Sequence, residues 1–196
     1  MVTSDRLLTT TRSVRRRLDL DRPVPLALVE ECLRIAQQAP CGSGRNLAHW
    51  VVVTDPATRA EIGEVYRSAF ERAAGSRRST PSLDSARYLA HRLGEVPVLV
   101  LACLETGGPL PDGNQAGLWG SLLPSVWSYM LAARARGLGT VLTTAHLAGE
   151  RQVAQLLGIP PGVHQGALIP TAYYLGDTFR PATRPPLEGV LHRERW

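Results

Sequence analysis

The chain has 196 residues, of which 44% are hydrophobic and 20% charged, the balance of a soluble globular protein with a sizeable core. Its formal net charge is +5, yet no helix-turn-helix, zinc-finger or aromatic stacking pattern accompanies the basic residues, which argues against nucleic-acid binding. The sequence has neither a signal-peptide pattern nor a run of about eighteen apolar residues, so we expect a cytoplasmic protein without a membrane span. The length suits one domain, and without internal repeats we expect a single domain over residues 1–196.

Arginines gather near both ends of the chain. The first cluster holds four arginines and a serine: Arg12, Ser13, Arg15, Arg16 and Arg17. The second is a pair, Arg180 and Arg184, in a proline-rich tail. A guanidinium group binds phosphate oxygens through two parallel hydrogen bonds, so the clusters suit a phosphate pocket if the fold brings the ends together. Solvated surface is the ordinary alternative for such arginines.

The first half of the chain predicts three helices and a strand. We expect a helix from Pro25 that ends before Pro40, a loop over residues 41–46 and a strand over residues 50–54. Asp55 and Pro56 supply an N-cap and a first-turn proline for the next helix. Ser82 is expected to cap a shorter helix after a polar loop.

The second half predicts strands over 96–103, 140–144 and 167–175, and helices over 118–136 and 150–157. Pro124 is expected to kink or break the first of these helices, and Pro170 indicates an edge or a bulge in the last strand. The tail from residue 177 carries too many apolar groups for a free end. Alternation of strands and helices alone favours a parallel α/β sheet.

Several familiar catalytic patterns are absent from the sequence. There is no Walker loop, no GxGxxG after a strand and no GxSxG elbow. The cysteines Cys32, Cys41 and Cys103 form no CxxC and the histidines form no HExxH, so we expect no metal site. Arginines suited to phosphate, together with glycine-rich loops and no evident nucleophile, are typical of an enzyme whose cofactor supplies the reactive atoms.

Five segments resemble the nitroreductase family in order and spacing. The stretch Arg12-Ser13-Val14-Arg15 is similar to that family's N-terminal flavin-phosphate motif. The other segments are residues 39–43 followed by 50–53, residues 137–140, residues 157–160, and residues 184–187 with the closing Trp196. The similarity runs from about residue 6 to the end of the chain.

This resemblance implies an α+β fold, with a mixed β-sheet flanked by helices, in an interlocked homodimer that binds FMN. The apolar helix 118–136 would then lie at the interface, and the tail would wrap the partner. The implied activity is hydride transfer from NADPH or NADH through flavin N5 to a small-molecule acceptor, namely a nitroaromatic, a quinone or an enone. A flavin-sequestering protein with little turnover and a biosynthetic flavin dehydrogenase are the alternatives.

The resemblance also assigns binding residues, while the flavin itself carries the hydride and no catalytic side chain is implied. Arg12, Ser13 and either Arg15 or Arg16 would hold the phosphate. Arg184 would close the pocket from the tail, with Arg180 as a second candidate. Thr143 and Thr144 would offer backbone N–H groups to the ring. The segment against the ring of the other subunit would contribute Pro40, Cys41, Gly42, Ser43 and Asn46.

The chain departs from the family pattern beside the flavin ring. Gly44 stands where close relatives have asparagine, Asn46 where they have glutamine, and Thr11 where an arginine often precedes the Arg-Ser pair. These changes preserve the phosphate residues and alter the expected ring contacts. Arg45 beside the flavin would favour an anionic reduced ring or an acidic substrate, unless it points to solvent.

Overall fold

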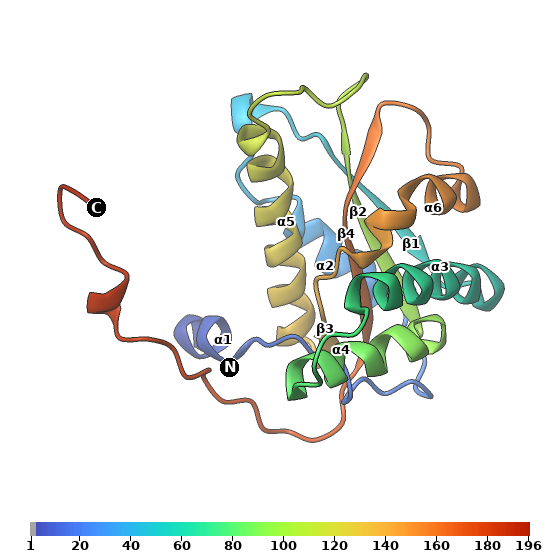
Figure 1. Ribbon diagram of the computed structural model, residues 1–196, viewed down its shortest axis with the longest axis horizontal. Coiled ribbons are helices and arrows are strands. Elements are labelled where there is room, and N and C mark those ends of the chain that lie inside the picture. Colours follow the sequence, from blue (N-terminus) through green and yellow to red (C-terminus); the bar gives the residue numbers. More distant parts are fainter. Residues whose placement is uncertain (1–2) are drawn as a thin grey trace.

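A central sheet lies between two layers of helices in this computed structural model, which describes residues 3–196 with the side chain of Ser43 excepted (Figure 1). The α-helices are α1 (Ser4–Thr10), α2 (Leu26–Ala36), α3 (Pro56–Ala74), α4 (Pro81–Arg92), α5 (Ala116–Ala135) and α6 (Glu150–Leu157). The strands are β1 (Ala48–Val53), β2 (Val98–Glu105), β3 (Leu138–Thr140) and β4 (Val163–Tyr173). Short 3-10 turns are η1 (Gly42–Gly44), η2 (Leu93–Glu95), η3 (Ala145–Gly149) and η4 (Leu187–Gly189). The predicted α+β class is confirmed.

The four strands are ordered β1-β2-β4-β3, and each neighbouring pair is antiparallel. The parallel sheet favoured by the alternation of elements is therefore wrong. Alternation alone misleads here because β2 and β4 pair directly although two helices and β3 separate them in sequence. One parallel bridge, between Ser13 and Thr140, adds the N-terminal segment to the sheet.

The side chains of β2 alternate between two cores because successive residues of a strand point to opposite faces. Val98, Val100 and Leu104 pack with α2 and α5. Leu99 and Leu101 face the other way, into a core built with α3, α4 and α6. Both faces of the sheet are thus covered, and the near-continuous apolar run of this strand is explained.

The helix ends follow simple capping rules, with two differences from expectation. Asp55 caps α3 as predicted, since its carboxylate accepts the Thr58 N–H at 2.8 Å. Thr80 and not Ser82 caps α4, because Pro81 occupies the first helical position and Thr80 Oγ1 accepts the Leu83 N–H. The helix α5 runs unbroken through Pro124, so of the predicted kink or break, the break is wrong. Packing of its buried face against the sheet and α2 maintains the helix despite the lost hydrogen bond.

Pro170 lies in a central strand, not at an edge, because β4 pairs with β2 on one side and β3 on the other. The β3 ladder ends at the pair Thr140–Thr171, and pairing resumes in the same register at Thr143–Leu168. Leu168 directs its N–H toward Thr143, so Pro170, two residues on, faces the same side with no N–H to give. The proline thus interrupts the ladder. The bulge lies four residues earlier in the same strand, at Gly166, which has no partner between the pairs Ala102–Ala167 and Cys103–Gln165.

The two chain ends approach each other at one edge of the body. Val14 N–H donates to Thr140 O at 2.9 Å, which fixes the start of the arginine segment on β3. Its end is fixed on β4, because Asp19 N–H donates to Tyr173 O and Leu175 N–H donates to Arg17 O, both at 2.8 Å. The last residues then run outward from the body (Figure 1). No helix in residues 3–196 is long and apolar enough to cross a membrane.

Candidate functional site

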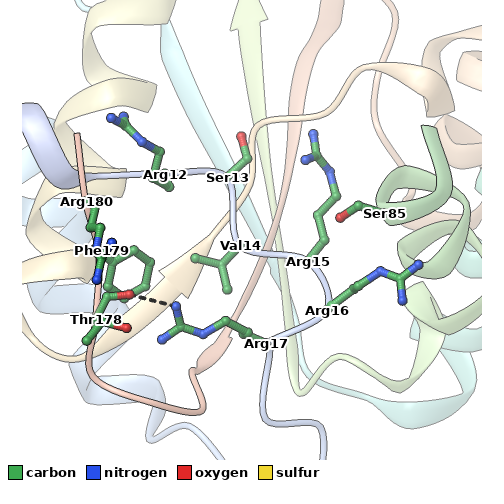
Figure 2. A pocket seen from close by; sticks show the side chains of 10 residues that line it. All are labelled: Arg12, Ser13, Val14, Arg15, Arg16, Arg17, Ser85, Thr178, Phe179 and Arg180. Atoms are coloured by element: carbon green, nitrogen blue, oxygen red, sulfur yellow. Dashed lines mark hydrogen bonds between the residues drawn. The ribbon is translucent and has the colours of Figure 1, made fainter. Parts of the chain in front are cut away.

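A cavity of about 340 Å³ opens where the arginine segment meets the start of the C-terminal tail (Figure 2). Its ten lining residues are Arg12, Ser13, Val14, Arg15, Arg16, Arg17, Ser85, Thr178, Phe179 and Arg180. Five of them are arginines, and in the described part of the chain no carboxylate lines it. The electrostatics of such a cavity favour a multiply charged anion.

Two buried side chains hold the arginine segment against the body. Val14 and Leu18 are 4% and 3% exposed and belong to the core beneath the sheet. Gly139 provides the space, since a β-carbon there would lie 3.0 Å from Val14 Cγ1 and 3.2 Å from Leu18 Cδ2. The Gly137-Leu138-Gly139 signal in the sequence therefore has a packing reason at its second glycine.

The segment sends its side chains in different directions. In Figure 2 Arg12, Ser13 and Arg15 extend to the same side of the backbone, whereas Arg16 reaches toward α4. The Arg16 guanidinium lies over the Tyr88 ring, 5.5 Å from its centroid. The sequence left Arg15 and Arg16 as alternatives, and only Arg15 shares the side of Arg12 and Ser13.

Two arginines of the cavity already hold backbone carbonyls. Arg12 donates from Nη1 to Thr11 O at 2.8 Å and from Nη2 to Thr9 O at 2.9 Å, at the end of α1. Arg17 donates from Nε to Leu175 O at 2.6 Å and from Nη1 to Thr178 O at 2.9 Å. These bonds preset the two side chains but leave their positive charge in the cavity.

The tail contributes Arg180 to the cavity and not Arg184, which lies exposed beyond it. Sequence reasoning ranked these two arginines in the opposite order. It counted Arg17 in the basic cluster without giving it a role, and it missed Phe179. The sequence did offer a signal for this pair, because an aromatic residue stands directly before Arg180 and the N-terminal cluster ends with a fourth arginine.

The loop expected to contact a flavin ring lies at the opposite end of α5. Gly42 N–H donates to Ser121 Oγ at 2.9 Å, near the start of α5, and Asn46 Oδ1 accepts the Ala48 N–H. Cys41 is half-buried and Pro40 is exposed, while the side chain of Ser43 lies outside the described atoms. The 20 residues of α5 span about 30 Å, so within one chain this loop and the arginine cavity are far apart (Figure 1).

Thr143 and Thr144 follow the break that Pro170 makes in the sheet. Thr143 uses its N–H and C=O in a reciprocal pair with Leu168, both bonds at 2.9 Å, so its N–H is not free for a ligand. Its hydroxyl is 2.6 Å from the Tyr66 hydroxyl, and burial raises the pKa of Tyr66. Thr144 is exposed, and its N–H meets no acceptor among residues 3–196. Of the two predicted N–H donors, only that of Thr144 is therefore available to a ligand.

His146 lies just past this turn and is fully buried. Neither ring nitrogen has a hydrogen-bond partner in the described structure. Burial lowers the pKa of His146 to about 4, because the interior disfavours the charged ring. At neutral pH this histidine is an uncharged core residue and supplies no charge to the cavity.

Comparison with known proteins identifies relatives over most of the chain. The family model of the Nitroreductase family matches residues 8–173. Iodotyrosine deiodinase of Nematostella vectensis is 28% identical over 178 residues, 86% of this chain and 67% of that protein. A crystal structure of oxidised iodotyrosine deiodinase bound to FMN and 3-iodo-L-tyrosine aligns over 97% of both chains, with a TM-score of 0.73 and 24% identity. A BluB-like flavoprotein from Clostridium difficile 630 aligns over both entire chains, with a TM-score of 0.76 and 16% identity.

Proposed function

Because the chain belongs to the nitroreductase family, we propose that it is an FMN-dependent oxidoreductase that takes hydride from NADPH or NADH and reduces a small acceptor. The observation that carries this proposal is the cavity lined by five arginines and, among residues 3–196, by no carboxylate. A flavin phosphate bears close to two negative charges at neutral pH, and such a dianion complements this lining. The solved structure of an iodotyrosine deiodinase with FMN supports the choice of cofactor.

The residues present fit the phosphate end of FMN. Arg12, Ser13 and Arg15 extend to one side and would hold the phosphate oxygens, with Arg180 approaching from the tail. Guanidinium-to-phosphate hydrogen bonds are charge-assisted and each is worth about 1.5–3 kcal/mol. Arg17 would act less directly, since its guanidinium already binds tail carbonyls.

At the ring end, the open N–H of Thr144 and the hydroxyl of Thr143 would be the donors of this chain. When bound, FMN supplies the hydride chemistry, and the chain binds and orients the cofactor. A donor held at a fixed position favours a ring that gains negative charge on reduction. The Pro40–Asn46 loop would approach the ring of a second copy.

A homodimer is part of the proposal for two reasons. The arginine cavity and the ring-contact loop lie at opposite ends of α5, so one chain alone does not join them (Figure 1). In addition α5 exposes Leu123 and Trp127, and the tail exposes Leu187 and Val190, apolar groups that a partner would cover. Light scattering coupled to size-exclusion chromatography tests this, and a monomer of 21.3 kDa at micromolar concentration contradicts it.

Two classes of compound are candidates for the electron acceptor. Nitroaromatics, quinones and enones are the first class, while similarity to iodotyrosine deiodinases favours an iodotyrosine as a second candidate. Turnover of 3-iodo-L-tyrosine is measured as iodide release, beside nitrofurazone and menadione reduction under the same conditions. Protein that holds flavin and reduces none of them supports a sequestering role.

The deciding experiment compares the visible spectra of the purified protein with added FMN and with riboflavin. We expect FMN to bind much more tightly than riboflavin, because only FMN carries the phosphate. Anaerobic addition of NADPH, and separately NADH, should bleach the bound flavin. Absence of FMN binding refutes the proposal, and bound flavin that stays oxidised with both donors refutes the reductase activity.

A further inference from the structure

We propose that Phe179, stacked between Arg17 and Arg134, is a positioning residue that holds the start of the tail against the cavity and so places Arg180. The inference rests on the proposed function in taking FMN as the anion, but the stack itself can be tested without flavin. Arg134 belongs to α5 and does not line the cavity. Its contact with the cavity lining runs through the Phe179 ring.

The geometry of this cluster is specific. The Arg134 guanidinium lies 3.9 Å from the centroid of the Phe179 ring, and the Arg17 guanidinium lies 4.5 Å from it. Tyr174 meets the same ring edge-on, with centroids 4.8 Å apart and planes at 88°. Arg134 also donates to the Tyr174 hydroxyl. One ring of the tail thus binds the arginine segment, the end of β4 and the end of α5 together.

A sharp turn brings Phe179 back onto the body. Gly176 has a φ of +77°, a conformation that residues with a β-carbon rarely adopt. A β-carbon there would also lie 3.1 Å from Arg17 Nη2. With Arg17 bound to the carbonyls of Leu175 and Thr178, the turn is fixed on both sides of the glycine. Phe179 is then directed to the stack, and Arg180 follows at the cavity.

The choice of an aromatic partner has an electrostatic consequence. Among residues 3–196 neither Arg17 nor Arg134 forms an ion pair with a carboxylate, whereas the nearby Arg136 pairs with Glu31. Cation–π contacts anchor a guanidinium without neutralising it. A carboxylate in the place of Phe179 would hold the arginines equally well and would repel the phosphate. The stack therefore fixes the tail and keeps the cavity fully positive.

The first test uses Arg134→Gln, with Arg136→Gln as the matched control. Both remove one positive charge at the end of α5, but only Arg134 contacts Phe179. We expect Arg134→Gln to weaken FMN binding roughly tenfold. Riboflavin binding should be unchanged, and Arg136→Gln should stay within about twofold of the parent protein. Equal FMN affinity in Arg134→Gln and Arg136→Gln overturns the inference, and a parallel loss of riboflavin binding assigns Arg134 a general structural role instead.

The second test needs no flavin. Chymotrypsin cleaves after Phe179, and the stack should protect this bond in the parent protein. We expect cleavage after Phe179, identified by mass spectrometry, to be roughly tenfold faster in Arg134→Gln and unchanged in Arg136→Gln. Unchanged cleavage in Arg134→Gln overturns the inference whether or not the protein binds FMN. Failure of the parent protein to bind FMN, with faster cleavage in Arg134→Gln, refutes only the proposed function.

A second pair of variants covers the case in which Arg134→Gln does not fold. Phe179→Tyr keeps the ring, and Phe179→Leu replaces it with an apolar group of similar volume. The tyrosine variant should bind FMN like the parent protein, and the leucine variant should bind it roughly tenfold more weakly with riboflavin affinity unchanged. Equal FMN affinity of the two variants overturns the inference, because packing alone would then explain Phe179.

Discussion

The cavity has two walls that are held in different ways. The N-terminal wall, residues 12–19, is paired through its backbone to β3 and β4 and anchored by the buried Val14 and Leu18. The tail wall, residues 176–180, is held mainly by the side-chain contacts of Arg17 and by the Phe179 ring. Backbone hydrogen bonds to the sheet break only when the whole domain unfolds, whereas side-chain contacts at the surface break locally. One wall is therefore held by the sheet itself, and the position of the other depends on the contacts of Arg17 and Phe179.

The largest effect is expected in the fixed wall. Arg15→Gln should weaken FMN binding about a hundredfold, because it removes charge-assisted bonds made by a residue whose neighbour Val14 is fixed on β3. Arg16→Gln should cost less than about fivefold, since Arg16 reaches toward Tyr88. Titration of flavin fluorescence measures both, with riboflavin as the ligand that lacks the phosphate. Equal losses in the two variants would mean that the segment binds as a diffuse charge and not through directed side chains.

Lowering the pH should reduce the free energy of unfolding of the domain and leave the Phe179 stack unchanged. The pKa of His146 is about 4 in the folded protein and about 6.5 in an unfolded chain, so the unfolded state binds more protons as the pH falls between these values. Stability should therefore decrease by about 2 kcal/mol from pH 7 to pH 5 on account of this residue. Chemical denaturation at the two pH values should show this loss in the parent protein and not in His146→Leu.

The control for this effect is His192→Gln, which changes a histidine of the exposed tail and should keep the full pH dependence of the body. The Phe179 stack is made of the Arg17 and Arg134 guanidinium groups and the Tyr174 ring. The rate of chymotrypsin cleavage after Phe179 should then be constant, once corrected for the pH dependence of the protease itself. A pH dependence of stability that persists in His146→Leu would assign the loss to other groups.

Two glycine substitutions compare the walls directly and should have the smallest effects. Gly139→Ala places a methyl group against Val14 and should destabilise the protein by about 1 kcal/mol, measured by denaturation. Gly176→Ala disturbs the turn beside Arg17 and should leave the midpoint of unfolding almost unchanged while raising cleavage after Phe179. If Gly176→Ala lowers global stability as much as Gly139→Ala, the tail wall is part of the folded core.

The sequence contained enough to predict most elements and the arginine cavity. Caps and breakers such as Asp55 and Gly158 act locally, so helix ends near them are readable. Strand order depends on which segments pair across long separations, and the β2–β4 pairing leaves no local signal. Pro170 was misread for the same reason, because its tolerance depends on a gap in the neighbouring strand.

The residues of the candidate site differ in the same way: those in a short motif can be predicted from the sequence, and those brought together by folding cannot. Arg12, Ser13 and Arg15 were found because a short motif carries them. The stack of Arg17 on Phe179 was missed because a guanidinium and a ring separated by most of the chain meet only after folding. Whether Arg180 or Arg184 reaches the cavity depends on the turn at Gly176, which composition does not disclose.

The length of α5 has a genetic consequence for the proposed dimer. Each complete site would combine the arginine end of one copy with the Pro40–Asn46 end of the other, so the two copies share two sites built from four half-sites. A chain damaged only at Arg15 and a chain damaged only in the loop would each be inactive alone. Paired in one heterodimer, they would place both defects in one site and leave the other intact. Two defective alleles expressed together should therefore complement each other.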